Sequence, residues 1–192
     1  MNNEQIGQII LEKLQKEDKV LDVGCGAGYL CNYFAKKLQK PVAGLDISNK
    51  GFRQAHDLCK KFNTCHLIKC LSGKAESIAG VVGEMKFDAV VFVHSFHHVK
   101  DVKKALGQVK VALSGRGQII IAEYSPEAGK SEDKCRRFTI KHIIGLLINS
   151  GFSNIYVEQP QKGFFLICAN PAQYGVKKRI LYEDQRKRNA GS

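Results

Sequence analysis

Three glycines at alternate positions, Gly24, Gly26 and Gly28, follow a short apolar run that carries one acid, Asp22. Glycine lets the backbone turn tightly and lets a ligand approach with no Cβ in the way. Apolar residues at helical spacing begin directly afterwards, so the turn opens a helix whose first N–H groups are unpaired donors. The spacing predicts a strand, a loop and a helix that together hold a nucleotide-like ligand.

Two features separate this loop from a dinucleotide-binding loop. The G-x-G-x-x-G fingerprint needs a glycine at position 29, where this chain has Tyr29. The carboxylate of Asp22 would repel a pyrophosphate, whereas it would attract the ammonium group of an amino-acid moiety. We therefore expect a ligand with a cationic amino-acid end, and an NAD-dependent oxidoreductase is disfavoured.

The segment LDVGCGAGYL, residues 21–30, resembles the first motif of the class I S-adenosylmethionine-dependent methyltransferases. The resemblance implies S-adenosylmethionine as the cofactor. By this resemblance, Asp46, at the end of the second predicted strand, would accept hydrogen bonds from both ribose hydroxyls. Asp22 would hold the methionine ammonium directly or through water. The residues expected to bind the donor in these two segments are Asp22, Gly24, Cys25, Gly26, Gly28, Asp46 and Ile47.

A third segment departs from the family pattern. Residues 73–77 read Gly-Lys-Ala-Glu-Ser, where the family often has Gly-Asp-Ala-Glu and the aspartate contacts the adenine amino group. Lys74 replaces that acid and cannot accept a hydrogen bond. Ala75 is expected to contribute through its backbone. Two interpretations of Glu76 stay open: a ligand contact in place of the missing acid, or an exposed loop charge.

The stretch His94-Ser95-Phe96-His97-His98-Val99 resembles the S-x-H-H-V segment of small-molecule methyltransferases of the ubiquinone/menaquinone-biosynthesis type. It lacks the Asn/Asp-Pro-Pro-Tyr/Phe segment of enzymes that methylate amino groups of nucleic acids and proteins. The family places this segment beside the transferring methyl group. His94 is therefore expected to line the donor site and is the catalytic candidate, as a wall or a base; the alternative for the histidines is a packing role.

Three histidines in five positions also suggest a metal site. No carboxylate accompanies them before Asp101, and the consecutive His97 and His98 are expected to diverge, so the sequence predicts no metal. Methyl transfer from a sulfonium needs mainly in-line alignment, with a general base only if the nucleophile is protonated.

The charge and the cysteines bound the choice of partners and compartment. The net charge of +12 favours encounter with anions, including nucleic acid, although a solvated surface explains it equally well. An anionic substrate group is one expectation for the basic loop of Lys130, Lys134, Arg136 and Arg137. Seven cysteines show no C-x-x-C pair, which favours free buried thiols in a reducing compartment over thiolate chemistry on a soft substrate.

Strand-like and helix-like runs alternate along the chain, which predicts an α/β fold. The expected architecture is a Rossmann-like, seven-stranded, mostly parallel sheet with helices on both faces. Predicted strands lie at 19–23, 42–47, 65–70, 87–93, 118–123, 154–158 and 163–169, the last two antiparallel. We expect one methyltransferase domain over residues 1–172 and a basic tail over 173–192. No apolar run is long enough to span a membrane and no secretory signal is visible, so the expected location is cytoplasmic.

These observations converge on one hypothesis and two alternatives. The hypothesis is an S-adenosylmethionine-dependent methyltransferase acting on a small, possibly anionic molecule, as a monomer or homodimer. The first alternative is an RNA or protein methyltransferase, suggested by the charge. The second is a non-catalytic cofactor-binding subunit that activates a partner, suggested by Lys74 and by the short segment after the fifth strand.

Overall fold

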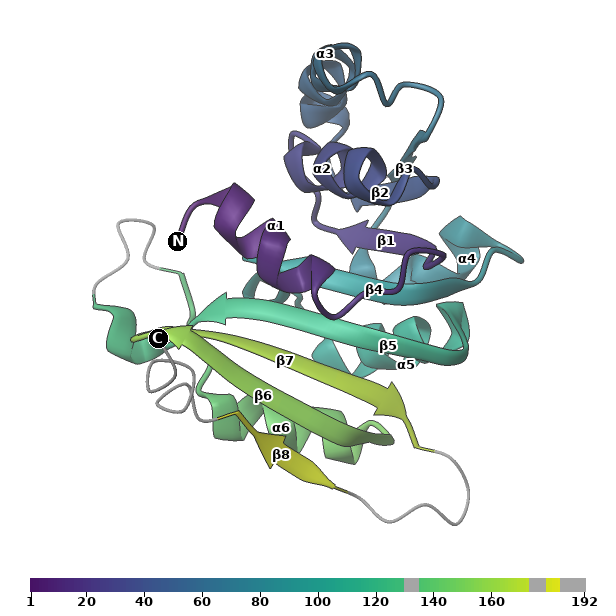
Figure 1. The fold of residues 1–192 in the computed structure, drawn as a ribbon. Helices are drawn as coiled ribbons and strands as arrows, with labels where there is room; N and C mark the ends of the chain where they lie inside the picture. Colours follow the sequence, from purple (N-terminus) through teal and green to yellow (C-terminus); the bar gives the residue numbers. More distant parts are fainter. Residues whose placement is uncertain (130–134, 173–178, 184–192) are drawn as a thin grey trace.

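A computed structural model describes residues 1–129, 135–172 and 179–183 (Figure 1). Within these residues, eight strands form one sheet in the order β3-β2-β1-β4-β5-β7-β6-β8. β7 runs antiparallel to both of its neighbours, and the other adjacent pairs are parallel. The strands are β1 (Val20–Val23), β2 (Val42–Asp46), β3 (Ile68–Ser72), β4 (Phe87–Val93), β5 (Leu113–Tyr124), β6 (Phe152–Gln161), β7 (Phe164–Pro171) and β8 (Ile180–Tyr182).

Helices cover both faces of the sheet. The apolar sides of α1 and α2 pack on one face, and those of α4, α5 and α6 pack on the other. Figure 1 shows α1 in front of the sheet and α5 and α6 behind it. The α-helices are α1 (Asn3–Leu11), α2 (Tyr29–Leu38), α3 (Phe52–Phe62), α4 (Ile78–Val82), α5 (Val102–Ala112) and α6 (Ile140–Asn149). Short 3₁₀ turns are η1 (Asn49–Gly51), η2 (Ala75–Ser77), η3 (Phe96–His98) and η4 (Pro126–Ala128).

Strand β4 illustrates why these residues form a doubly covered sheet. Successive side chains of a strand point to opposite faces. Val90 and Phe92 belong to the apolar core on the α5 side, whereas Ala89 and Val91 belong to the core on the α1–α2 side. A strand buried on both faces therefore reads as a continuous apolar run, as central parallel strands do.

The predicted α/β class, the mostly parallel sheet and the two helical layers are confirmed. Three strands differ most from their predicted bounds. The strand predicted at 65–70 spans Ile68–Ser72, the one predicted at 118–123 begins at Leu113, and the one predicted at 154–158 spans Phe152–Gln161. The register between β4 and β5 shifts between Phe87 and Ala89, and this irregularity lets Leu113 pair before the regular ladder starts.

The sheet has one strand more than the seven predicted. β8 pairs in parallel with β6, with Ile155 opposite Ile180 and Val157 opposite Tyr182. Three residues of the predicted basic tail thus extend the sheet. The remainder of that tail, except Arg179 and Glu183, lies outside the described residues. In the described part of the chain, no helix combines the length and apolar character needed to cross a membrane.

The expectation of free, buried cysteines is wrong for five of the seven. Cys59 and Cys65 form a disulfide, because the left-handed cap of α3 at Asn63 turns the chain back and brings their Cα atoms to 4.7 Å. Cys25, Cys31, Cys70, Cys135 and Cys168 form no disulfide. Of these, Cys31 and Cys168 are buried, Cys70 is exposed, and the other two are half-buried. A spacing of six residues did not reveal this bond, since closure depends on the turn geometry.

Candidate functional site

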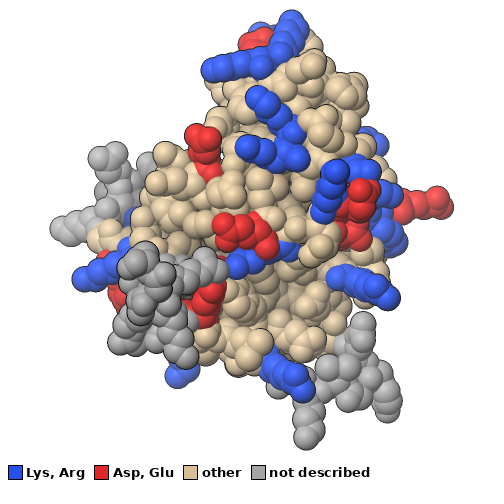
Figure 2. Space-filling view, viewed as in Figure 1, with Lys and Arg blue, Asp and Glu red and all other residues tan. Residues whose placement is uncertain are grey.

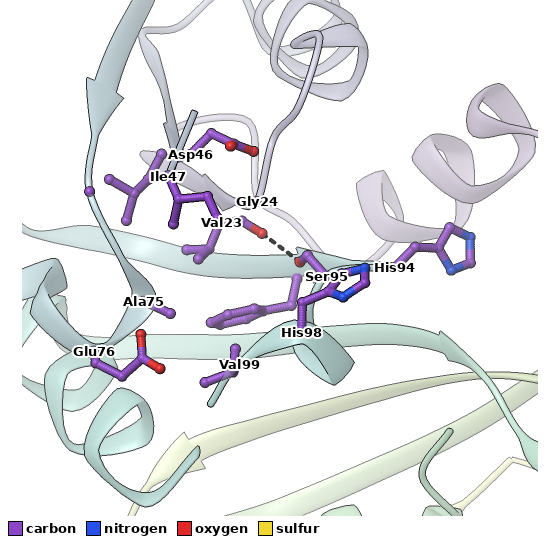
Figure 3. A pocket seen from close by; sticks show the side chains of 13 residues that line it. Val23, Gly24, Asp46, Ile47, Ala75, Glu76, His94, Ser95, His98 and Val99 are labelled. Atoms are coloured by element: carbon purple, nitrogen blue, oxygen red, sulfur yellow. Dashed lines mark hydrogen bonds between the residues drawn. The ribbon is translucent and has the colours of Figure 1, made fainter. Parts of the chain in front are cut away.

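The strand order reverses between β1 and β4, which is where open α/β sheets bind ligands, outside the carboxyl ends of the strands. A cavity of about 610 Å³ lies there, and we call it the donor cavity. Its walls come from the ends of β1, β2 and β4 and from the segments that follow β3 and β4 (Figure 3). Six predicted site residues line it: Gly24, Asp46, Ile47, Ala75, Glu76 and His94.

The glycine loop has the tight geometry that its spacing predicts. Gly24, Gly26 and Gly28 have φ values of 75°, 51° and 72°, a region that side chains rarely adopt. The loop is tied to β2, because the N–H groups of Gly24 and Cys25 donate to the Leu45 carbonyl at 2.7 and 3.2 Å. A Cβ on Gly24 would lie 2.4 Å from the Cβ of Ser95. Glycine therefore lets the loop contact the end of β4.

Asp46 is held in one orientation by the backbone around it. Its Oδ2 accepts from the Gly26 N–H and its Oδ1 from the Ser48 N–H, both at 2.9 Å. A carboxylate has about four acceptor positions, so acceptor capacity is left for a ligand in the cavity. Ile47 beside it is 75% exposed, which is unusual for a large apolar side chain and provides a surface for a flat, apolar ligand group.

Asp22 lies behind the loop, outside the residues that line the donor cavity. It is 3% exposed, and its Oδ2 accepts from the Cys31 thiol at 3.4 Å. Burial raises the pKa of Asp22 to about 7, against the bond from Cys31, which lowers it. The predicted contact between Asp22 and the donor's ammonium group stays a prediction. Because Asp22 lies outside the cavity lining, its placement favours a contact through a bridging water.

Cys25, Gly26 and Gly28 belong to the glycine loop but lie outside the cavity lining. The Cys25 sulfur packs over Gly44, where an added Cβ would lie 2.8 Å from it. Gly28 begins α2 in the left-handed conformation, and its N–H donates to the Cys25 carbonyl at 2.8 Å. These three residues support the loop that carries Gly24.

The segment after β3 places Ala75 and Glu76 at the cavity and leaves Lys74 exposed outside its lining. The Oε1 of Glu76 accepts from the N–H groups of Lys100 and Asp101 at 3.0 and 3.1 Å, which anchors the start of α5. Partial burial raises the pKa of Glu76, but these backbone bonds and the nearby Lys74 outweigh it, so the pKa lies below its usual value. Glu76 is thus an ionised residue in the cavity wall, and its carboxylate also holds the backbone at the start of α5.

His94 sits where β4 ends, in a left-handed backbone conformation with φ of 51°. Its ring stacks on Tyr124 with centroids 4.8 Å apart and meets the edge of Phe164 at 5.8 Å. Burial is the main influence on its pKa and lowers it, so the imidazole is neutral near pH 7. A neutral ring at the cavity wall can accept a proton.

A second cavity of about 290 Å³ adjoins the first, and we call it the histidine pocket. His94 and His98 line both cavities. The other residues of the histidine pocket are His97, Glu123, Tyr124, Cys135 and Arg137.

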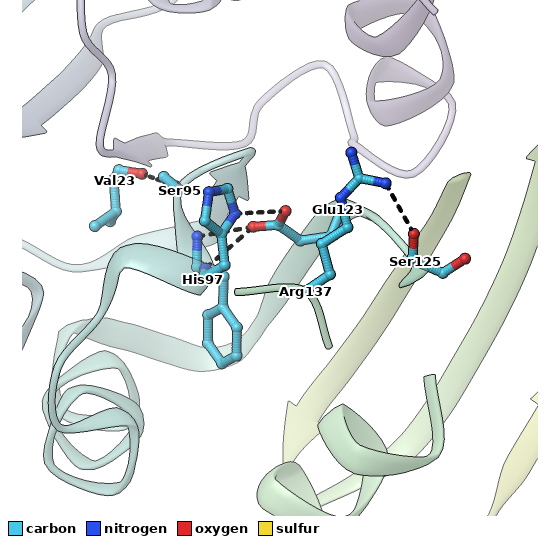
Figure 4. A network of polar contacts seen from close by, with 7 residues as sticks. Val23, Ser95, His97, Glu123, Ser125 and Arg137 are labelled. Carbon is cyan, nitrogen blue, oxygen red and sulfur yellow. Dashed lines mark hydrogen bonds and ion pairs between the residues drawn. The ribbon is translucent and has the colours of Figure 1, made fainter. Parts of the chain in front are cut away.

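A buried carboxylate organises the histidine pocket (Figure 4). Glu123, 3% exposed at the end of β5, accepts from the backbone N–H groups of Phe96 and His97 through Oε1. Its Oε2 lies 2.9 Å from Nδ1 of His97. The expectation that His97 and His98 diverge is wrong, because the 3₁₀ turn η3 brings their ring centroids to 4.0 Å.

Two residues of the predicted basic loop, Arg136 and Arg137, belong to the described part of the chain. Arg137 donates through Nη1 to the carbonyls of Ser125 and Gly129, at 3.2 and 2.9 Å, and so closes the loop after β5. Arg136 lies over the ring of Phe138, 4.3 Å from its centroid. Lys130 and Lys134 lie outside the described residues. Of the two described residues in that set, Arg137 lines the pocket and Arg136 does not.

Three contacts that shape the two cavities were not predicted from the sequence. Gly51 passes so close to the glycine loop that a Cβ there would lie 2.2 Å from the Gly26 carbonyl oxygen. Ser95 donates its hydroxyl to the Val23 carbonyl at 2.5 Å, linking β4 to β1. Glu123 lies 26 residues from His97. The glycine at position 51, shortly after the strand predicted at 42–47, was a readable signal for a close backbone approach, whereas nothing local marked the Glu123 pairing.

Comparison with known proteins agrees with this geometry. A family profile described as "Methyltransferase domain" matches residues 21–121, from β1 through most of β5. The chain belongs to this family, the class I S-adenosylmethionine-dependent methyltransferases, for which S-adenosylmethionine is the cofactor. The predicted family resemblance is therefore confirmed.

Individual relatives are distant. Ajmaline N-methyltransferase of Rauvolfia serpentina is 29% identical over 123 residues, which cover 64% of this chain and 42% of the relative. The chloroplastic tocopherol O-methyltransferase of Arabidopsis thaliana is 32% identical over 114 residues, 59% of this chain and 32% of the relative. The chain thus spans less than half the length of these two relatives. A crystal structure of a SAM-dependent methyltransferase from Aquifex aeolicus has the same fold, with a TM-score of 0.69 at 18% identity, covering 85% of this chain and 88% of that one.

Proposed function

We propose that this protein transfers a methyl group from S-adenosylmethionine to a small-molecule acceptor. The observation that carries the proposal is the pair of adjoining cavities at the reversal of strand order, which share His94 and His98. The larger cavity, about 610 Å³, has the size of a cofactor site, and the smaller one opens beside it at the end of β4.

In this proposal each wall of the donor cavity has a task. Asp46 accepts hydrogen bonds from the ribose hydroxyls, while Ile47 and Ala75 flank the adenine. Gly24 admits the methionine portion, whose ammonium group Asp22 balances through water. Methyl transfer then needs an acceptor atom in line with the sulfonium carbon, because the donor is already activated. His94, neutral and half-buried, is positioned to accept a proton where the acceptor carries one.

The acceptor is proposed to be small, on two grounds. The histidine pocket of about 290 Å³ admits a compact group, and Arg137 in its wall suits an acceptor with an anionic substituent. The two curated relatives carry the names of methyltransferases for ajmaline and tocopherol, both small molecules. Methylation at nitrogen and at oxygen are both represented among them.

An RNA or protein acceptor is the alternative that the net charge of +12 supports. On the face seen in Figure 2, Lys and Arg side chains are scattered between uncharged surface and interspersed with acids. Nucleic-acid-binding surfaces usually gather basic residues into a patch or stripe. We therefore place the small molecule first. A third reading is a non-catalytic donor-binding subunit, for which Lys74 outside the cavity lining is the supporting feature.

We further propose that residues 1–172, together with β8, form one methyltransferase domain that acts as a monomer or homodimer in the cytoplasm. The pairing of β8 with β6 supports including this strand in the domain. Size-exclusion chromatography with light scattering measures the oligomeric state.

Calorimetric titration with S-adenosylmethionine, S-adenosylhomocysteine and NAD tests the donor site. We expect micromolar binding of both sulfur ligands and none of NAD. Asp46→Ala should weaken binding at least about tenfold, since it removes a charged acceptor and the partner of the Gly26 and Ser48 N–H groups. Asp57→Ala, an exposed acid on α3, is the matched control.

Each outcome of that titration has a defined reading. Wild-type protein that binds neither sulfur ligand contradicts the donor-site assignment. Donor binding with a salt-sensitive shift of RNA in a gel favours the nucleic-acid alternative. Donor binding without turnover on any acceptor, alone or with RNA, favours the non-catalytic subunit.

A further inference from the structure

We propose that His97, His98 and Cys135 form a binding site for one zinc ion in the histidine pocket. One ring nitrogen of each histidine and the sulfur of Cys135 lie within 4.8 Å of one another. A tetrahedral zinc ion with its usual bonds to nitrogen and sulfur needs ligand atoms roughly 3.3–3.6 Å apart. The ligand atoms are therefore at most about 1.5 Å farther apart than a coordinating arrangement needs, a distance that side-chain rotation covers.

Glu123 prepares His97 for this role. Metal-binding histidines almost always donate their second ring N–H to a carboxylate or carbonyl, which sets the tautomer and the ring orientation. The Oε2 of Glu123 lies 2.9 Å from Nδ1 of His97, which leaves Nε2 as the coordinating nitrogen. Glu123 is itself fixed, because it is 3% exposed and accepts from two backbone N–H groups. A carboxylate that orients a histidine in this way is the usual partner of a metal-binding histidine.

The local backbone brings the other two ligands to His97. The 3₁₀ turn η3 places the rings of His97 and His98 with centroids 4.0 Å apart and tilted by 49°. Cys135 lies in the segment between β5 and α6, and it lines the same pocket. The two reasons for predicting no metal, divergent histidines and a missing carboxylate, are both removed by this arrangement.

The donor set and the charges favour zinc. Two imidazoles and one thiolate form a mixed nitrogen–sulfur set of the kind that binds Zn²⁺, and three protein ligands leave a fourth position open, as in catalytic zinc sites. The negative charges of Glu123 and of the Cys135 thiolate attract the ion, whereas Arg137 in the same wall opposes it. Arg137 also donates to two backbone carbonyls, which partly offsets its charge at the pocket. On binding, the Cys135 thiol gives its proton to solvent and its sulfur bonds to the metal.

The position of the site points to a role for the ion in activating the methyl acceptor. His98 lines the donor cavity as well, so the open fourth position lies beside the place of methyl transfer. Zinc would lower the pKa of a hydroxyl or thiol bound at that position, so the acceptor would lose its proton to solvent or to the neutral His94 and become nucleophilic. This consequence rests on the proposed function; the binding of zinc does not.

Zinc titration against a chromophoric chelator tests the site. The chelator-washed protein is kept under nitrogen without a reductant, so that the Cys59–Cys65 disulfide stays closed. We expect one equivalent of zinc per chain. Cys135→Ser and His98→Ala should each weaken binding more than about 100-fold, and Glu123→Gln, which alters a positioning residue, by about 10–100-fold. Cys70→Ser, which removes an exposed free thiol elsewhere, should leave zinc affinity unchanged.

Cobalt substitution identifies the ligands directly. The Co²⁺ protein should show a thiolate-to-cobalt charge-transfer band that Cys135→Ser abolishes and Cys70→Ser retains. No stoichiometric zinc binding by the wild-type protein, or binding that survives both Cys135→Ser and His98→Ala, overturns the proposal. Calorimetry with S-adenosylmethionine on the same samples separates the two hypotheses: protein that binds the donor but not zinc refutes the metal site alone. Far-ultraviolet circular dichroism establishes that each variant is folded.

Discussion

The donor cavity takes its shape from the backbone of the glycine loop, and in this sense we call it backbone-built, whereas the histidine pocket is held together by contacts between side chains. In the donor cavity, glycines with positive φ and the N–H groups around Asp46 create the shape. In the histidine pocket, Glu123, His97 and Cys135 come from three separate segments and meet only in the fold. The two cavities share His94 and His98, so a backbone-built and a side-chain-built site meet at one strand end.

This difference explains how well each part of the site could be read from the sequence. A backbone-built site depends on residue types at short spacing, such as glycines two positions apart, and such spacing is visible in the sequence. A side-chain-built site depends on which segments become neighbours. Family motifs thus mark the donor cavity and the histidines, whereas no motif marked Glu123 and Cys135, which complete the histidine pocket.

Two buried carboxylates sharpen the contrast. Asp22 and Glu123 are both 3% exposed. Glu123 accepts from two backbone N–H groups and lies against an imidazole, whereas the hydrogen bond to Asp22 comes from the Cys31 thiol, a weak donor. Burial without strong donors raises a carboxyl pKa, which is the case for Asp22.

The largest expected effect is on the pH dependence of stability. The pKa of Asp22 is about 7 in the folded protein, above its ordinary value of 3.8. The folded state therefore binds more protons between about pH 4 and pH 7, and the free energy of unfolding falls as pH rises through that range. The contribution of Asp22 is on the order of 4 kcal/mol over the whole window. Asp22→Asn should remove this fall.

Urea unfolding of wild type and Asp22→Asn between pH 4.5 and 8, buffer values chosen at about half-unit steps to span that window, measures the difference. The stability of the variant relative to wild type should increase with pH. Asp57→Asn, at an exposed position on α3, is the control. Parallel profiles for wild type and Asp22→Asn would contradict the assignment of a raised pKa.

The next effect concerns the backbone of the donor cavity. Gly24→Ala combines a φ of 75° with a Cβ placed 2.4 Å from that of Ser95, so the loop must move. We expect donor affinity to fall by about 100-fold and the free energy of unfolding to fall by about 1–3 kcal/mol. Gly107→Ala is the matched control, because Gly107 lies within α5 and a Cβ there meets no atom within 4 Å. Unchanged calorimetric affinity in Gly24→Ala would sink the backbone-built description.

Gly51→Ala separates close approach from backbone conformation. Its φ of −74° is ordinary, yet a Cβ would lie 2.2 Å from the Gly26 carbonyl oxygen. We expect about tenfold weaker donor binding, through displacement of the loop that contacts Asp46, and a loss of stability of about 1–2 kcal/mol. Titration calorimetry and thermal unfolding measure the two quantities. If stability falls while donor affinity stays, the contact is structural only.

Glu123→Gln should have the smallest effect on donor binding, less than about threefold, because Glu123 lies in the histidine pocket and outside the donor cavity. Stability should fall by about 1–3 kcal/mol, since a buried hydrogen-bonded charge is replaced. Glu127→Gln, at an exposed position in η4, is the control for both. A loss of donor affinity as large as that of Asp46→Ala would show that the two cavities do not act separately.

Much of the fold could be predicted because its signals are local. The strand at 87–93 was placed at its observed bounds, and the strand predicted at 42–47 differs from β2 by one residue. β8 was not predicted, since a three-residue strand has little pattern of its own and forms through its pairing with β6. The start of β5 at Leu113 depends likewise on an irregular pairing with Phe87.

The sequence alone determined the class of the protein, the glycine loop, and the places of Asp46 and His94 at strand ends. These features follow from residue type at short range: glycine's freedom at positive φ, the alternation of apolar residues along strands, and acids directly after them. Only the tertiary structure decided that Asp22 faces Cys31, that Cys59 bonds to Cys65, and that Glu123 orients His97 toward His98 and Cys135. Contacts between distant segments depend on how the sheet and its helices pack, and spacing along the chain does not encode that geometry.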